Sequence, residues 1–233
     1  MATQVACDAA EENEAPMSLK KLTIEALCQE ARTFADVESK HSEPCLFGVT
    51  DGKAVGTYLE HKFRQHLSES YAFALGNSAS GIDFPGINVD MKVTSAKQPQ
   101  SSCPFKSARQ KVFGLGYSLL VFVYDKSDDQ ATGTGRLTIL HAILVDQALT
   151  GDYQTTSGLQ QILDNSGNLE DMAAFMRDRN LPLDDIQANE IAEEVMKNGI
   201  KVGYLTISNA LQWRLQYARA IVHAGSVKGI ARL

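Results

Sequence analysis

The sequence lacks several patterns by which common classes of protein are recognised. Its four cysteines, Cys7, Cys28, Cys45 and Cys103, are far apart and form no CxxC pair, so neither a zinc site nor a framework of structural disulfides is indicated. A reducing, cytoplasmic location is therefore expected. The sequence also contains no internal repeat and no Gly-rich nucleotide loop, HExxH or GxSxG motif. These absences remove the most readily recognised nucleotide-binding, zinc-protease and serine-hydrolase signatures.

Long apolar runs are absent as well. No run approaches the roughly 20 apolar residues that span a bilayer, and the opening MATQVACD has neither the basic segment nor the apolar core of a secretory signal. We therefore expect no membrane partner. The 233 residues, 44% of them hydrophobic and 21% charged, are typical of one soluble globular domain with a substantial core.

The charge is segregated along the chain. A net charge of −6 argues against a protein that coats nucleic acid indiscriminately. Residues 1–16 are polar and acidic without hydrophobic periodicity, and we expect a disordered tail there. Residues 164–194 are rich in acid, whereas residues 196–233 contain none. The cations of that last segment are Lys197, Lys201, Arg214, Arg219, Lys228 and Arg232. This pattern favours a localised phosphate-binding surface, although a solvated helix face would produce it too.

Residues 81–95, GIDFPGINVDMKVTS, carry the strongest chemical signal. The Pro85-Gly86 pair indicates a turn, and the residues after it alternate between apolar and polar, which is the period of a half-buried strand. We expect a hairpin whose second strand projects Asp90 and Lys92 from one face. Asp83, on the strand before the turn, would reach the same patch.

Two carboxylates beside a lysine are typical of a magnesium site. Mg²⁺ takes oxygen ligands, usually one or two carboxylates with waters and a phosphate, and Asp83 and Asp90 are the candidate ligands. Such a metal lowers the pKa of a bound water and stabilises charge on a phosphate oxygen. Lys92 would orient that water or neutralise the developing charge. The plainer interpretation is a surface hairpin with a local ion pair, because Asp-x-Lys is a very common sequence.

The neighbouring segments extend this pattern. A helix is expected from about residue 53 to 70, with Glu60 beside its apolar face. Glu60 either lines a cleft there or pairs with Arg64 one turn away. A second helix is expected at about 107–115, followed by an apolar strand at 119–124.

This order of elements is that of the common core of the PD-(D/E)XK nucleases. Over about residues 53–125 the chain resembles that superfamily and, within it, the type II restriction endonucleases. The resemblance implies that Asp83 corresponds to the first metal-binding aspartate, Asp90 and Lys92 to the (D/E)xK pair, and Glu60 to the helix glutamate. One departure is that the proline follows Asp83 by two positions instead of preceding it.

The resemblance implies a function as well as a site. It implies Mg²⁺-dependent hydrolysis of phosphodiester bonds at a specific double-stranded DNA sequence, with Asp83, Asp90, Lys92 and Glu60 as the catalytic residues. It also implies a homodimer on a palindromic site. Two alternatives stay open at this point. One is a repair or junction-directed nuclease with the same core, and the other is a noncatalytic α/β protein that binds DNA or a partner.

Polar and basic residues after the hairpin are candidates for DNA contact. The loop expected at 96–105 carries amides and hydroxyls that match base edges, and the helix after it has a basic flank and a positive N-terminus. A final helix, expected from about 209 to 223, interleaves aromatic and basic residues. The candidate DNA-binding residues are Lys97, Gln98, Gln100, Ser101, Ser102, Lys106, Arg109, Lys111, Arg214 and Arg219. The plainer interpretations are an ordinary polar loop and an amphipathic helix packed through Trp213 and Tyr217.

The predicted fold is α/β, with a restriction-endonuclease-like core of about five strands in a central mixed sheet flanked by helices. Residues 17–233 are expected to form one nuclease domain, comprising a catalytic core at about 53–145, a helical insertion at about 147–199 and a strand and basic helix at 200–233. Other expected elements are a helix at about 19–39 capped by Ser18, strands at 137–145 (with His141 in the core) and 201–207, and insertion helices at about 154–164, 169–179 and 185–198.

Overall fold

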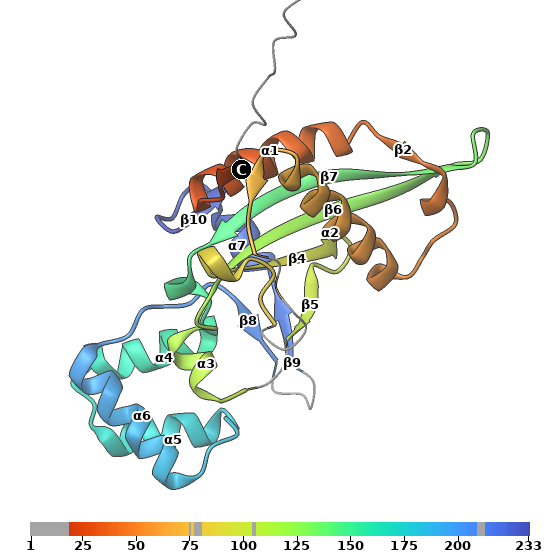
Figure 1. Cartoon of the computed structure of the whole chain (residues 1–233). Helices are drawn as coiled ribbons and strands as arrows, with labels where there is room; N and C mark the ends of the chain where they lie inside the picture. The colour runs from red at the N-terminus through yellow and green to blue at the C-terminus, as the bar shows by residue number, and fades with distance from the viewer. Residues whose placement is uncertain (1–18, 75, 77–80, 104–105, 209–212) are drawn as a thin grey trace, which may run out of the picture.

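The centre of the protein is a five-stranded mixed sheet, seen in a computed structural model that describes residues 19–74, 76, 81–103, 106–208 and 213–233 (Figure 1). The strand order is β10-β7-β6-β4, and β2 pairs with the far end of β7. Helices flank this sheet, so the expected α/β fold is confirmed. The strands are β2 (Ser42–Glu43), β4 (Val89–Ser95), β6 (Ser118–Asp129), β7 (Thr134–Val145) and β10 (Ile230–Arg232).

The middle of the sheet is formed by β6, which is parallel to β4 and antiparallel to β7. Its apolar run, Leu119 to Tyr124, is buried throughout, as expected for a strand covered on both faces. Parallel strands need a crossover connection, and β5 (Gln100–Cys103) and α3 (Arg109–Phe113) supply it. Because Asp90 pairs in register with Leu119, β4 is held against the best-buried part of the sheet.

Helices α1 (Ile24–Glu38) and α2 (Gly52–Ser68) cover one face of the sheet. The predicted apolar positions of α2, at spacings of four, are buried there against Met91 and Phe122. Helix α1 is capped by Thr23, whose Oγ1 accepts a hydrogen bond from the Ala26 N–H, and not by Ser18, which lies outside the described residues. The residues before it include β1 (Lys20–Lys21), which pairs with β3 (Tyr71–Ala72).

A second, three-stranded sheet packs on the opposite face, in the order β5-β9-β8. Strand β8 is Thr206–Ile207 and β9 is Trp213–Gln216. The predicted helix at 209–223 is therefore wrong for residues 213–216, and only α7 (Ala218–His223) is helical; residues 209–212 lie outside the described part. Buried residues alternate with exposed ones along β9, and this strand period outweighs the one-turn spacing of Trp213 and Tyr217.

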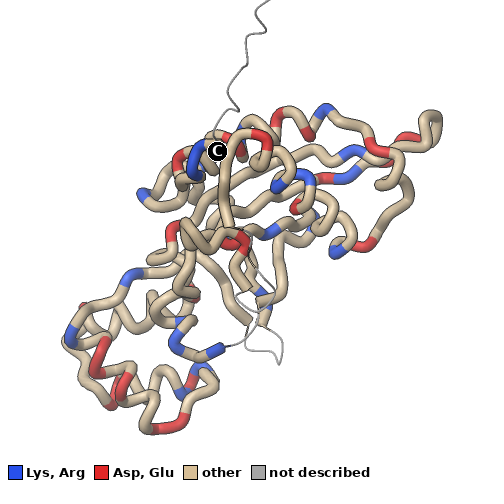
Figure 2. Tube along the Cα trace, viewed as in Figure 1, with Lys and Arg blue, Asp and Glu red and all other residues tan. Residues whose placement is uncertain are grey.

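Three helices form a unit of their own below the sheet in Figure 1: α4 (Tyr153–Asp164), α5 (Leu169–Asp178) and α6 (Asp185–Asn198). Their bounds lie within one residue of those predicted. They share a separate apolar cluster that includes Met172, Met176 and Ile191, and Figure 2 shows that acidic residues gather on this unit. Buried Asp152 joins the unit to β8, because its Oδ1 accepts from the Ile207 N–H at 2.8 Å.

Several local predictions need correction. Residues before the Pro85–Ile87 turn form only a single antiparallel bridge, Phe84 to Val89, so Asp83 does not lie on a regular strand. The loop expected at 96–105 contains β5, and the strand expected at 201–207 is confined to β8. His141 is half-buried and not in the core. Within the described ranges, no helix is long and apolar enough to cross a membrane.

Candidate active site

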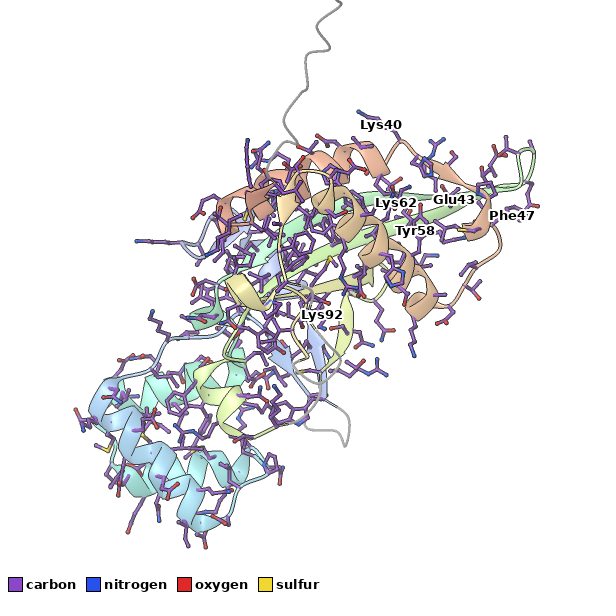
Figure 3. All side chains as sticks on the ribbon, in the orientation of Figure 1. Lys40, Glu43, Phe47, Tyr58, Lys62 and Lys92 are labelled. Carbon is purple, nitrogen blue, oxygen red and sulfur yellow. The ribbon has the colours of Figure 1, made fainter. Side chains whose placement is uncertain are left out.

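Strand β4 brings Asp90 and Lys92 to the same face of the sheet; Figure 3 labels Lys92 near the middle of the molecule. Val89 and Met91, between and beside them, are buried in the apolar layer under α2. This is the alternation that the sequence predicted. Asp90 is only 3% exposed, and its Oδ2 lies 2.8 Å from Lys92 Nζ. The local ion pair of the plainer interpretation is therefore present, but it is not on the surface, since the Asp90 side chain is buried and that of Lys92 is mostly enclosed.

Asp83 reaches this face from the segment before the turn. Its Oδ2 accepts a hydrogen bond of 2.8 Å from the Met91 N–H, which fixes the carboxylate beside β4. Its other oxygen, Oδ1, accepts from Nη2 of Arg64 on α2. Asp83, Asp90 and Lys92 line one cavity of about 340 Å³ together with Glu60 and Arg64. The structure thus brings together all four residues that were predicted to be catalytic.

Glu60 projects from α2 over the cavity. The alternative that it pairs with Arg64 is not found, because Arg64 donates to Asp83. No ion pair or hydrogen bond of the Glu60 carboxylate occurs within the described part of the chain. Burial raises the pKa of Glu60, and the nearby charge of Asp83 raises it further, while Lys92 and Arg64 oppose the shift.

The electrostatics of the site centre on Asp90. Burial raises the pKa of Asp90 to about 7, and this shift is opposed by the charge of Lys92. Burial alone would lower the pKa of Lys92, but the carboxylates of Asp90, Asp83 and Glu60 outweigh it, so the net shift is upward and the ammonium group stays charged. Three carboxylates therefore face two cations, Lys92 and Arg64.

These residues fit a hard divalent cation. Every candidate donor is a carboxylate oxygen, the ligand type that Mg²⁺ and Ca²⁺ prefer. Asp90 Oδ2 is buried and, despite its proximity to Lys92, no described residue offers it hydrogen-bond geometry. No three or more His, Cys, Asp or Glu side chains cluster as metal ligands in the ranges that the structure covers. Two carboxylates at one cavity could hold such a divalent cation if waters completed its ligands.

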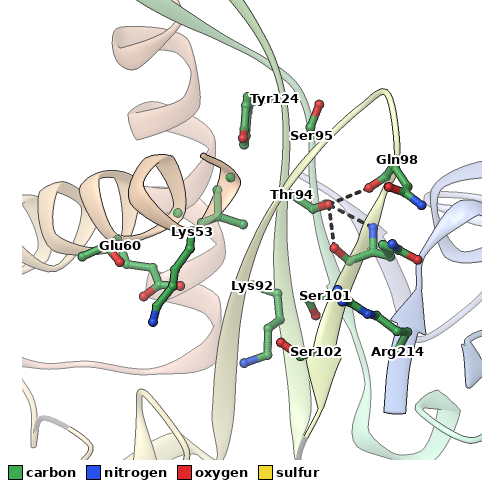
Figure 4. Close-up of a pocket in the computed structure, with 15 residues that line it drawn as sticks. Lys53, Glu60, Lys92, Thr94, Ser95, Gln98, Ser101, Ser102, Tyr124 and Arg214 are labelled. Atoms are coloured by element: carbon green, nitrogen blue, oxygen red, sulfur yellow. Dashed lines mark hydrogen bonds between the residues drawn. The ribbon is translucent and has the colours of Figure 1, made fainter. Parts of the chain in front are cut away.

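A larger cleft of about 530 Å³ opens beside this cavity, and Glu60 and Lys92 line both (Figure 4). One wall is the first half of α2, with Lys53 and Thr57. The other wall is formed by the end of β4 and by β5 and β9. It contains the predicted DNA-binding residues Gln98, Gln100, Ser101, Ser102 and Arg214. In Figure 4, Lys53 and Arg214 approach the cleft from opposite sides.

The remaining DNA-binding candidates lie outside this cleft. Lys97 and Lys106 are exposed and do not line it. Arg109 pairs with Glu194 of α6 and lies over the Phe113 ring, 4.8 Å from its centroid. Arg219 lies over the Tyr153 ring, with its guanidinium carbon 3.3 Å from the centroid.

Lys111 does not lie on an exposed basic flank as predicted. It is 3% exposed, and its Nζ lies 5.6 Å from the centroid of the Trp213 ring. The next residue, Val112, packs into the apolar cluster of the helical unit, and this fixes α3 so that the Lys111 side chain is enclosed. Burial accordingly lowers the pKa of Lys111.

Of the cleft wall formed by α2, the sequence indicated only Glu60. Lys53 and Thr57 line the cleft, yet they were treated only as members of a helix. A signal was present at the start of that helix. Asp51 caps it by accepting from the Lys53 N–H at 3.0 Å, and Lys53, two residues after this cap, lies at the open, positive end of the helix.

Comparison with known proteins identifies the family. The family model described as Type II restriction enzyme NspV matches residues 21–232. One relative, Type II restriction enzyme NspV from Nostoc sp., is 63% identical over 209 residues, which are 90% of this chain and 95% of that protein. No solved structure matches. The family match runs from the second residue of β1 to the end of β10 and includes the site on β4. The resemblance to type II restriction endonucleases is thus confirmed, and the chain belongs to the NspV family of these enzymes.

Proposed function

We propose that this site-specific endodeoxyribonuclease uses Mg²⁺ held by Asp83 and Asp90 at the floor of the cleft. The observation that carries the proposal is the arrangement on β4. Asp90 Oδ2 lies 2.8 Å from Lys92 Nζ, and Asp83 is fixed beside them by the Met91 N–H. When bound, the metal supplies a water of lowered pKa and stabilises charge on the phosphate.

The protein's own groups divide the remaining work. Lys92 keeps its proton and holds a positive charge where the attacking water and the scissile phosphate meet, so it orients the water and stabilises the developing negative charge. Glu60, on the opposite side of the cavity, limits the positions open to that water and adds a further acidic group near the metal. The enclosed position of Asp90 strengthens each of these interactions, because charges act more strongly where water is excluded.

The larger cleft is the proposed DNA channel. Phosphates would pass along Lys53 and Thr57 toward Lys92, which lines both cavities. Arg214 lies opposite Ser102 in the β5–β9 ladder and projects from the exposed side of β9. We propose that the exposed side of the β5–β9 strand pair faces the major groove, where arginine pairs with guanine and glutamine with adenine. Gln98, Gln100 and Arg214 are therefore the proposed base-reading residues.

Two further properties are proposed from the type of enzyme. A homodimer would match the two-fold symmetry of a palindromic site. A cytoplasmic location would give the enzyme access to incoming DNA. Neither the repair or junction-directed nuclease nor the noncatalytic protein is favoured by any feature of the cleft, and the similarity to a type II restriction enzyme disfavours both.

The decisive experiment is incubation of the purified protein with several unmodified plasmid and phage DNAs, with Mg²⁺ and with EDTA. Asp90→Asn and Lys92→Met variants are compared with Arg177→Met, which removes an exposed ion pair of the helical unit. We expect discrete fragments that require Mg²⁺, disappear in both site variants and persist in Arg177→Met. Fragments that persist in Lys92→Met would contradict the assigned site. Cutting confined to branched DNA would support the junction nuclease instead.

A further inference from the structure

Two cations, Lys92 and Arg64, line the cavity. The proposed mechanism gives a role to Lys92 but none to Arg64. Arg64 lies on α2 one turn after Glu60, and its Nη2 donates to Asp83 Oδ1. The side chain is 27% exposed. Its Nε is buried and has no hydrogen-bond partner within the described residues. An arginine with a buried, unsatisfied Nε is not in its best hydrogen-bonding arrangement, so the contact with Asp83 dominates its position.

The two cations of the site serve different carboxylates. Lys92 lies 2.8 Å from Asp90, whereas Arg64 is paired with Asp83. The Met91 N–H already engages Asp83 Oδ2. Oδ1 is therefore the more available oxygen of Asp83 for a metal ion, and it is the oxygen that Arg64 contacts.

We propose that Arg64 is a built-in counter-cation that competes with the metal for Asp83. In the metal-free protein, it neutralises Asp83 and holds the carboxylate close to β4. Metal binding through Asp83 and Asp90 requires Arg64 to give up Oδ1. Arg64 is thus a positioning residue that stabilises the metal-free site and weakens metal binding. This inference rests on the proposed metal site.

The charges of the cavity give the reason for such a residue. Glu60, Asp83 and Asp90 are three acids within one cavity lined by Lys92 and Arg64. Without Arg64, three acids would face only one lysine, and their mutual repulsion would oppose folding in the absence of metal. A divalent cation would then relieve more repulsion than it does in the native protein. Folding stability and metal affinity are therefore expected to change in opposite directions.

The variant Arg64→Met tests this coupling. It keeps a long side chain on α2 but removes the charge, and the Met91 N–H still orients Asp83. We expect lower thermal stability than the native protein in EDTA, a larger gain in Tm on adding Mg²⁺, and a Kd for metal about tenfold lower, which corresponds to ~1.4 kcal/mol. Arg64→Lys keeps a cation near Asp83 and is expected to behave like the native protein.

Metal affinity is measured without DNA, by titrating the full chain with Mn²⁺ and following the free ion by electron paramagnetic resonance. Mn²⁺ accepts the same oxygen ligands as Mg²⁺. The control Arg109→Met removes an ion pair with Glu194 outside the cavity and is expected to leave the Kd unchanged. Arg64→Gln, which can still donate to Asp83, provides a second variant if Arg64→Met does not fold.

The outcomes separate the two proposals. If the native protein binds Mn²⁺ and Asp83→Asn weakens it, but neither Arg64→Met nor Arg64→Gln tightens binding, the role of Arg64 is refuted while the metal site stands. If Asp83→Asn and Asp90→Asn leave Mn²⁺ binding unchanged, the metal site itself is refuted, and the role of Arg64 with it. Tighter binding together with a larger Mg²⁺-induced gain in Tm in the Arg64 variants supports the inference.

Discussion

Asp90 Oδ2 and Lys92 Nζ lie 2.8 Å apart, two residues from each other on a strand whose first three residues are buried. The pairing explains how a carboxylate that is 3% exposed can be tolerated in the interior. It also places a charged lysine next to the oxygen that the metal would take. A cation at Asp90 would leave Lys92 available to the phosphate.

Loss of Lys92 is expected to remove cleavage while DNA binding persists. Lys92→Met should lower the single-turnover cleavage rate by about 10²–10³-fold, the usual effect of removing one group that stabilises a transition state. The affinity for DNA in EDTA should change little, because the scissile phosphate is only one of many contacted. Rate and affinity are measured on the same oligonucleotide. A rate within a few-fold of the native rate would rule out a catalytic role for Lys92.

Metal binding is expected to weaken as the pH falls through about 7. Burial raises the pKa of Asp90 to about 7, and a metal binds only the ionised carboxylate. Below that pH, a proton must leave before metal can bind, so the affinity should fall by up to about tenfold for each pH unit. Above it, the affinity should level off. Titrations with Mn²⁺ at several pH values test this, and an affinity that is flat between about pH 6 and 8 would contradict it.

The raised pKa of Asp90 has the opposite effect on the folding stability of the metal-free protein, which should decrease as the pH rises. The folded protein holds the Asp90 proton up to a pKa of about 7, whereas the ordinary value is 3.8. Between these values the folded state binds more protons than the unfolded state, so stability should fall as the pH rises and become constant above about 7. Asp90→Asn should lose this component of the pH dependence. Urea titrations in EDTA at about pH 5 and 8 measure it.

Local patterns account for what the sequence could predict. The alternation along β4 identified Asp90 and Lys92, and apolar periodicity placed α2 and the insertion helices within a residue or two. Strand β9 was missed because Trp213 and Tyr217 are also spaced like one helical turn. Its strand conformation depends on pairing with β5, more than 100 residues earlier in the chain. The pattern of residues in a short stretch of sequence does not indicate a pairing with so distant a strand.

The contact between Arg64 and Asp83 could not be predicted from the sequence for a related reason. Its partners are 19 residues apart in the chain, and the sequence offered only the nearer acid, Glu60, as a possible partner of Arg64. The path of the chain before β4 brings Asp83 to the side of α2 that carries Arg64. Lys53 was missed because its role depends on what faces α2 across the cleft, and that wall contains β9.

A buried network between α1 and α2 should contribute measurably to stability. Glu38 is 2% exposed. It is paired with Lys62 Nζ at 2.8 Å and accepts from Tyr58 OH at 3.0 Å; Figure 3 labels Tyr58 and Lys62 on α2. Lys62→Met would leave the Glu38 carboxylate without its counter-ion, and we expect a loss of about 1–3 kcal/mol in the free energy of unfolding.

The control for this network is Arg177→Met, because the Arg177–Asp185 pair is exposed on both sides and should contribute less than about 1 kcal/mol. Glu38→Gln in the Lys62→Met background should recover part of the loss, since it removes the stranded charge. Urea denaturation measures all three variants. Equal losses for Lys62→Met and Arg177→Met would show that burial of Glu38 is not costly.

The two walls of the cleft are expected to make different kinds of DNA contact. Lys53 lies at the start of α2 and should bind a phosphate, so Lys53→Gln should weaken binding to all sequences alike. The slope of log K against log salt concentration should fall by about 1. Arg214 projects from the β5–β9 ribbon. Arg214→Gln should reduce discrimination against a changed base pair by about 1–3 kcal/mol.

Arg219→Gln is the matched control for both variants, because the Arg219 guanidinium lies over the Tyr153 ring and outside the cleft. Fluorescence anisotropy in EDTA, over about 50–200 mM salt, would compare cognate and altered sites for the native protein and the three variants. A changed salt-dependence slope for Arg219→Gln would indicate that the DNA passes near α7 and the helical unit. Unchanged discrimination in Arg214→Gln would remove β9 from base reading and leave the amides of Gln98 and Gln100 as the specificity determinants, because these are the remaining base-reading candidates on that wall.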